Sequence, residues 1–247
     1  MMFLRRTKIF YGWFVVAGAV AVTFGISGGT FSFGVFLKPM TEEFGWSRAS
    51  LSLAFGITFM LSGLLRPLAG WLADRYIPKT AVLSGVVVMG AMLLLIPFLS
   101  NLAQLYLLFA IMAIGITLGM GPILTKIVSS WFHQRRGFTL GLVSGAGSFG
   151  AMILVPGASL FLVLADWKQA YWFLGLLLLV FVLPIGFLLI KNRPQDMCLE
   201  PMGAADGDAS NIGGGAGRPE TMLGRDATLR EALHSPLFRR LTFGYFV

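Results

Sequence analysis

Two basic residues, Arg66 and Lys126, lie inside stretches of sequence that are otherwise apolar. A charged side chain in such a stretch is costly to keep from water, so it usually faces a cavity or a polar partner. The guanidinium of Arg66 offers a planar fork of donors that suits a carboxylate. We therefore predict that Arg66, and secondarily Lys126, bind an anionic ligand. Two alternatives stay open: Arg66 pairs with backbone carbonyls or supports Asp74, and Lys126 extends along its helix to water.

Six long apolar segments carry these residues, and each exceeds or approaches the ~20 helical residues that cross a bilayer. They run over Phe10–Leu37, Leu51–Ala73, Ala81–Leu99, Leu102–Val128, Phe138–Leu164 and Ala170–Ile190. Backbone polar groups in lipid must be satisfied within the segment, so these segments are predicted to be helices. The sequence thus predicts an all-α, polytopic membrane protein, a bundle of six transmembrane helices in a lipid bilayer.

The composition agrees, because 56% of the residues are hydrophobic and only 12% are charged. Many of the 31 glycines suit helices that approach one another closely in a membrane. Pairs with four-residue spacing stand at Gly25 and Gly29, Gly115 and Gly119, and Gly141 and Gly145. These pairs predict faces of tight helix packing.

The net charge of +8 is not a sign of nucleic-acid binding, because the charges stand mostly in loops. The single cysteine, Cys198, lies outside the apolar segments and forms no disulfide within the chain. His133 is expected to be a solvated loop residue. No nucleophile–base pair, metal-ligand cluster or phosphate-binding loop is present in the sequence, so we predict no enzymatic activity, no metal and no cofactor.

Lysine and arginine in the short loops predict the orientation of the helices. One side holds Arg5, Arg6, Lys8, Arg75, Lys79, Arg135, Arg136, Lys191 and Arg193, and the other holds Lys38, Arg48 and Lys168. Nine against three places the first group, and with it the N-terminus, in the cytoplasm. Lys38 is then an anchor at the outer interface.

The composition changes after Ile190, where Gly, Ala, Asp and Pro become frequent. We predict a bundle over residues 1–194 and a flexible cytoplasmic linker over 195–236. Residues 237–247 turn apolar again, and eleven residues of helix cover only about half of a membrane. They predict an incomplete seventh transmembrane helix and therefore an incomplete sequence.

The loop between the second and third segments carries the first motif. It runs Gly70-Trp71-Leu72-Ala73-Asp74-Arg75-Tyr76-Ile77-Pro78-Lys79. This resembles the signature loop of the major facilitator superfamily, although Ile77 and Pro78 replace the usual glycine and first basic residue. The resemblance implies that Gly70, Asp74 and Arg75 form a latch between two halves of a transporter on the cytoplasmic side.

A second motif precedes the fifth segment. It runs Trp131-Phe132-His133-Gln134-Arg135-Arg136-Gly137-Phe138-Thr139-Leu140-Gly141. It resembles the entry to helix five in the bacterial monocarboxylate porter and oxalate–formate antiporter branch. The resemblance implies that Arg135 and Arg136 anchor this end and belong to the latch. Phe33–Lys38 and Tyr11–Trp13 also look like that branch.

The resemblance implies the N-terminal half of the superfamily fold, built as two inverted three-helix repeats, in which the first and fourth helices line a central path. Glycines and hydroxyls would let both helices bend: Gly28, Gly29, Thr30 and Ser32 in the first, and Gly119, Gly121, Pro122 and Thr125 in the fourth. Phe31 stands where animal lactate transporters carry a functional lysine, so the role of that lysine does not transfer to this chain. Thr30 and Phe31 are counted among the candidate substrate-binding residues of the first helix.

The predicted function is secondary transport of small organic anions, mono- or dicarboxylates, by alternating access in a bacterial inner membrane. The implied partners are the anion, a missing C-terminal six-helix half, and a proton or an exchanged solute. No carboxylate lies within the six segments, since Asp74 and Asp166 stand at their ends, so this part supplies no proton-coupling group. The alternatives are a major facilitator transporter of a drug, sugar or neutral metabolite, and a non-transporting scaffold or half-transporter.

Overall fold

The computed structural model describes residues 10–75, 78–132, 134–197 and 202, apart from the side chains of residues 73, 74 and 196. All of them belong to one compact unit, Met1–Asp206. The predicted linker lies outside the described residues except for 195–197 and 202, and the predicted seventh helix lies wholly outside them.

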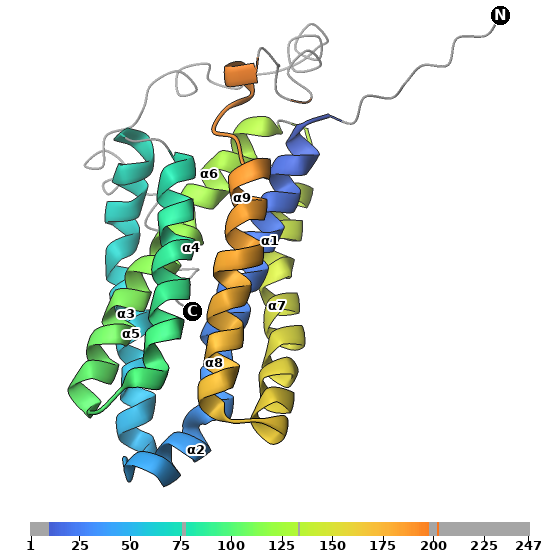
Figure 1. The fold of residues 1–247 in the computed structure, drawn as a ribbon. Coiled ribbons are helices and arrows are strands. Elements are labelled where there is room, and N and C mark those ends of the chain that lie inside the picture. Colours follow the sequence, from blue (N-terminus) through green and yellow to red (C-terminus); the bar gives the residue numbers. More distant parts are fainter. Residues whose placement is uncertain (1–9, 76–77, 133, 198–201, 203–247) are drawn as a thin grey trace, which may run out of the picture. The chain divides into compact units, whose positions relative to one another are not determined.

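Every element named in the described residues is helical, which confirms the all-α prediction (Figure 1). Six stretches are long and apolar enough to cross a membrane. The elements are α1 (Gly12–Phe31), α2 (Phe33–Phe44), α3 (Arg48–Arg75), α4 (Pro78–Leu95), η1 (Ile96–Phe98), α5 (Leu102–Gly119), α6 (Pro122–Trp131), α7 (Arg136–Leu164), α8 (Trp167–Leu176), η2 (Leu177–Val182), α9 (Leu183–Leu189) and η3 (Pro194–Met197).

The first apolar segment is divided at Ser32, and its second part, α2, continues seven residues beyond the predicted end at Leu37. Residues 38–44 were expected in a loop but are helical. Phe36 and Met40, one turn apart, are both fully buried and hold this turn on the bundle. Gly45 ends α2 with a left-handed φ of 67°, which favours glycine.

The fourth segment is also divided, as the glycines and Pro122 predicted. Helix α5 ends in extended backbone at Met120, and Gly121 has a φ of 86°, a conformation that L side chains rarely adopt. Pro122 then opens α6, where a missing N–H and a fixed φ are tolerated. The chain therefore restarts a helix in the middle of a membrane span.

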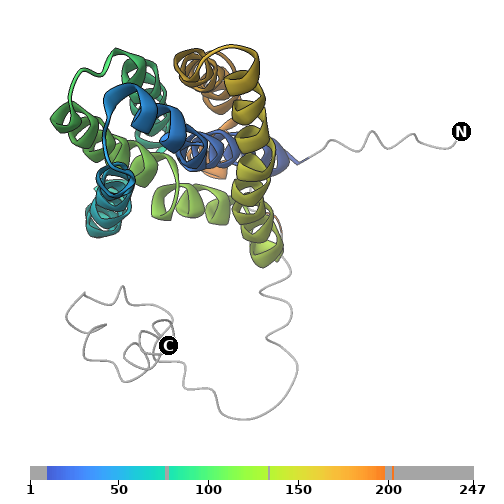
Figure 2. The same ribbon diagram turned by 90° about the horizontal axis from the view of Figure 1, so that it is seen from below.

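Close backbone contacts at glycines hold the bundle together. Helix α1 packs extensively on α7, and α5 packs on both α3 and α4; Figure 2, which looks along the bundle, shows α1 at the middle with α7 beside it. A Cβ on Gly85 of α4 would stand 2.7 Å from the Gly115 carbonyl oxygen, and one on Gly28 of α1 would stand 2.9 Å from that of Gly150. Only glycine permits such approaches.

Two of the three predicted glycine pairs pack against neighbouring helices, namely Gly25 with Gly29 and Gly115 with Gly119. The third pair differs. A Cβ on Gly141 or Gly145 of α7 would have no described atom of another helix within 4 Å. The packing expected at this pair is therefore absent from the described part of the chain.

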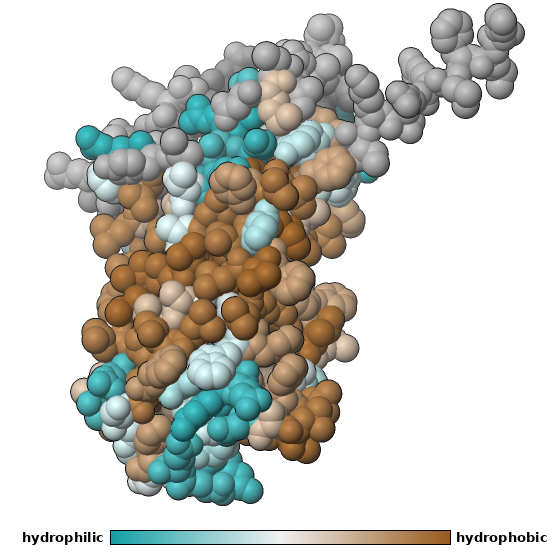
Figure 3. Space-filling view, viewed as in Figure 1, coloured by the Kyte–Doolittle hydropathy of each residue, from teal (hydrophilic) through white to brown (hydrophobic). Residues whose placement is uncertain are grey.

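The first and second spans resemble the fourth and fifth in helix continuity, and the second and fifth also in burial. The first and fourth spans are divided, whereas the second and fifth are the unbroken helices α3, of 28 residues, and α7, of 29 residues. These two also share the smallest buried fraction of the six, 22%. Apolar side chains cover the middle of the bundle in Figure 3, and hydrophilic ones gather toward its ends. This pattern is that of paired three-helix repeats whose second helices keep an open face.

Candidate functional site

A pocket of about 270 Å³ opens between α1, α3 and α5, beside the break that precedes α6. It is lined by Ser27, Thr30, Phe31, Phe59, Ser62, Arg66, Ile116, Thr117, Met120 and Gly121. Three of the four predicted substrate-binding residues, Thr30, Phe31 and Arg66, therefore lie together. Arg66 is the one charged residue among those that line the pocket.

Arg66 enters the pocket from α3, which also contributes Ser62 one turn earlier and Phe59 nearly two turns earlier. These three positions share a helix face because of the 3.6-residue period. Arg66 is exposed at the mouth of the pocket and forms no hydrogen bond or ion pair with another described residue. Its guanidinium is thus a membrane-embedded donor group whose partner is not among the described side chains.

The hydroxyl groups of the pocket differ in what they offer a ligand. Thr30 donates to the Ile26 carbonyl at 2.7 Å and Thr117 donates to the Ala113 carbonyl at 2.7 Å, so the proton of each hydroxyl is already used within its own helix. Ser27 is 4% exposed and makes no hydrogen bond with another described residue. Its hydroxyl proton is therefore available to a ligand.

Aromatic and aliphatic side chains complete the wall. The Phe31 and Phe59 rings are tilted against each other with centroids 6.2 Å apart, and Ile116 and Met120 face them from α5 and the joint that follows. Phe31 remains 48% exposed. The site combines one cation, several hydroxyls and an apolar wall, an arrangement suited to a small amphipathic anion.

Comparison with known proteins agrees with this arrangement. The sequence profile of the Major Facilitator Superfamily matches residues 19–247. The chain belongs to the Major Facilitator Superfamily. Members of this superfamily are membrane transporters, and the bundle described above is a six-helix part of their fold.

Several curated relatives belong to the branch that the motifs predicted. The uncharacterized MFS-type transporter YcxA of Bacillus subtilis is 25% identical over 191 residues, 77% of this chain and 47% of that protein. The oxalate:formate antiporter of Oxalobacter formigenes is 24% identical over 181 residues, 72% of this chain and 42% of that protein. Monocarboxylate transporter 1 of Mus musculus is 24% identical over 215 residues, 83% and 43% respectively. The chain spans about half the length of these relatives.

The fourth predicted binding residue, Lys126, does not line the pocket. It lies on the exposed face of α6, one turn after the break, together with Thr125. The opposite face of α6 is buried through Ile123, Leu124 and Ile127. Lys126 therefore adds positive charge beside the pocket without entering it.

Four of the predicted latch residues, Gly70, Arg75, Arg135 and Arg136, lie within the described part of the chain. The Arg75 guanidinium lies over the Trp71 ring of its own helix, 5.5 Å from the centroid. Arg135 and Arg136 are exposed at the start of α7, and a Cβ on Gly70 would have no described atom of another helix within 4 Å. The side chain of Asp74 and all of His133 lie outside the described residues.

Sequence reasoning missed six residues that line the pocket with Arg66: Ser27, Phe59, Ser62, Ile116, Thr117 and Met120. Helical spacing links Phe59 and Ser62 to Arg66, and Ser27 lies three residues before Thr30. The position of Arg66 could therefore have identified the pocket residues of its own helix through their helical spacing. Thr117 comes from another helix and had no such signal.

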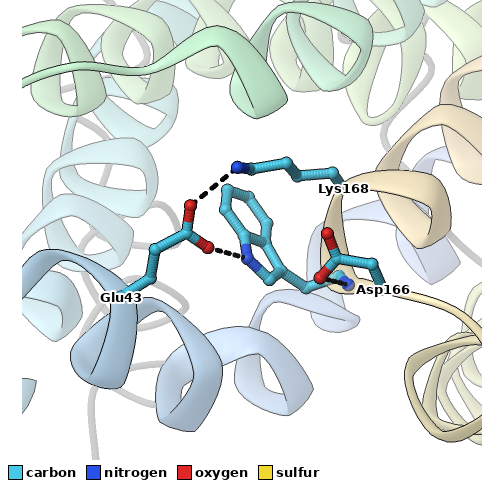
Figure 4. Close-up of polar contacts among 4 residues, drawn as sticks. Glu43, Asp166 and Lys168 are labelled. Atoms are coloured by element: carbon cyan, nitrogen blue, oxygen red, sulfur yellow. Dashed lines mark hydrogen bonds and ion pairs between the residues drawn. The ribbon is translucent and has the colours of Figure 1, made fainter.

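A polar cluster at the α2 end of the bundle was also missed. Glu43 of α2 accepts hydrogen bonds from Trp167 Nε1 at 2.5 Å and from Lys168 Nζ at 2.6 Å, as Figure 4 shows. Asp166 accepts from the Trp167 backbone N–H at 2.7 Å and caps α8. The two bonds to Glu43 tie α2, in the first span, to the start of α8, in the sixth.

Proposed function

We propose that this chain is the N-terminal half of a secondary transporter that carries small organic anions, mono- or dicarboxylates, by alternating access. The proposal rests mainly on the placement of Arg66. This cation belongs to a membrane span, lines the pocket and has no described partner. An arginine in this setting is stable only with an acceptor, and a substrate carboxylate supplies one. Thr30 and Phe31 flank the anion, and Lys126 raises the local potential.

The names of two relatives support this class of substrate, since one exchanges oxalate and formate and another is a monocarboxylate transporter. The pocket supports it as well. About 270 Å³ accommodates a molecule of a few carbon atoms, and the lining offers the positive charge of Arg66 without an acidic side chain to oppose it.

A second six-helix half completes the transporter in this proposal. The chain spans about half of its relatives, and helices α3 and α7 keep open faces marked by Gly63, Gly70, Gly141 and Gly145. We propose that these faces pack on the second half. Residues 1–194 then form the first bundle, 195–236 the linker and 237–247 the start of the seventh helix, with Asp74, Arg75, Arg135 and Arg136 latching the halves together.

Ligand binding tests the substrate class. The purified 247-residue chain in nanodiscs is expected to bind radiolabelled L-lactate or oxalate saturably, in a scintillation proximity assay. Unlabelled carboxylate should compete, whereas lactamide, which has the shape of lactate without its charge, should not. Equal competition by lactamide, or no binding of either carboxylate, would contradict an anion site.

Orientation is tested separately. We propose that the α3–α4 and α6–α7 ends face the cytoplasm of a bacterial inner membrane, because nine of the loop cations gather on that side. In intact cells and a Cys198→Ser background, a membrane-impermeant maleimide should label Ser100→Cys and Gln169→Cys. In cells that carry the unsubstituted chain, the native Cys198 should label only after permeabilisation. The reverse pattern would show that the bundle is inserted the other way.

A further inference from the structure

The joint between α5 and α6 exposes the start of a helix at the edge of the pocket. Met120 and Gly121 both line the pocket and directly precede α6. Glycine at the N-cap position supplies no side chain to cap the helix, and no side-chain cap is present. The first N–H groups of α6 therefore begin beside the ligand space.

The first turn of α6 leaves specific donors unused. Thr125 N–H bonds to the Gly121 carbonyl at 3.0 Å and closes the first turn. Pro122 has no N–H, so the N–H groups of Ile123 and Leu124 precede the first bond of the helix and have no partner within it. The ten-residue helix also carries a partial positive charge at this end.

Ser27 provides an independent indication of a ligand at the same place. It belongs to α1, is 4% exposed, lines the pocket and makes no hydrogen bond with another described residue. Its hydroxyl oxygen is not among the fully buried unpaired atoms of the described residues, so a ligand in the pocket can reach it. Arg66 and Ser27 thus bring unpaired donors from α3 and α1 into the pocket, and Gly121 places the start of α6, with its unpaired N–H groups, at the pocket edge.

We propose that the N-terminus of α6 is a second anion-binding element of this site, which holds the substrate carboxylate together with Arg66. This inference rests on the proposed function and adds the groups that orient the anion. The carboxylate accepts from the Arg66 guanidinium and from the N–H groups of Ile123 and Leu124, while Ser27 donates from α1. A bound anion therefore connects α3 to the second half of the fourth span.

Selective labelling makes the backbone donor visible. The sequence contains only two Pro-Ile dipeptides, Pro122-Ile123 and Pro184-Ile185. The whole chain in nanodiscs is labelled with carbonyl-¹³C proline and ¹⁵N isoleucine. A carbonyl-filtered NMR spectrum then shows one isoleucine amide signal for each of the two dipeptides. Titration with L-lactate should move the Ile123 signal along the same saturation curve as binding, and leave Ile185, in α9, in place. Lactamide should move neither.

A matched pair of variants tests the charge at this helix end. Thr125 lies in the first turn of α6 on its exposed face. Thr125→Asp places a negative charge there, whereas Thr125→Asn has the same shape without the charge. Lactate should bind about threefold more weakly to Thr125→Asp than to Thr125→Asn.

The outcomes separate this inference from the proposed function. Suppose lactate binds and Arg66→Gln abolishes that binding. A stationary Ile123 signal, or equal affinity of the Asp and Asn variants, would then overturn the role of α6 and leave Arg66 as the anion site. Binding that does not depend on Arg66 would instead overturn the proposed function. A moving Ile123 signal together with the weaker Asp variant supports the inference.

Discussion

Replacing Arg66 with lysine is expected to weaken binding of L-lactate or oxalate more than tenfold. The substitution keeps the positive charge but removes the planar fork that holds both oxygens of a carboxylate. Losing a charge-assisted hydrogen bond costs about 2 kcal/mol, which exceeds the 1.4 kcal/mol of a tenfold change in affinity. Scintillation proximity binding with the purified chain in nanodiscs measures this effect directly.

Arg48→Lys is the matched control, because Arg48 is exposed at the opposite end of the same helix and does not line the pocket. Its affinity should equal that of the unmodified chain. Unchanged affinity in Arg66→Lys would contradict a substrate contact. If Arg66 instead supports the Asp74 latch, Arg66→Lys and Asp74→Asn should produce similar losses of thermal stability that do not add in the double variant.

The number of spans and the position of Arg66 could be predicted from the sequence because both follow from hydropathy along the chain. A membrane imposes a minimum length on each apolar segment and a penalty on each charge within it. The division of the fourth span was predictable for a local reason as well. Gly121 and Pro122 each restrict the backbone in a way that interrupts a helix.

Contacts between distant segments could not be predicted in this way. The bond from Lys168 to Glu43 joins residues 125 positions apart, and nothing in the sequence near either residue indicates the other. The glycine pairs show the same limit. Gly115 and Gly141 are each followed by a second glycine four residues later. A Cβ would contact another described helix only at Gly115, because packing depends on which helix face the fold turns inward.

The interface between α1 and α7 gives a second large expected effect. Gly150→Ala should lower the apparent melting temperature of the chain, because a Cβ at this position would stand 2.8 Å from the Phe24 carbonyl carbon and 2.9 Å from its Cα. Backbone atoms cannot rotate away as a side chain does, so α1 and α7 must separate. Overpacking of this kind costs about 1–3 kcal/mol.

Gly145→Ala is the control on the same helix, since its Cβ would meet no described atom of another helix within 4 Å. Alanine favours a helix over glycine by about 1 kcal/mol in water, so this variant should unfold at the same or a higher temperature. Both temperatures follow from intrinsic tryptophan fluorescence in detergent. Gly150→Ala should also weaken lactate binding, because α1 carries Ser27 and Thr30 into the pocket and would be displaced. Equal melting temperatures for the two variants would show that α1 and α7 are not in backbone contact at Gly150.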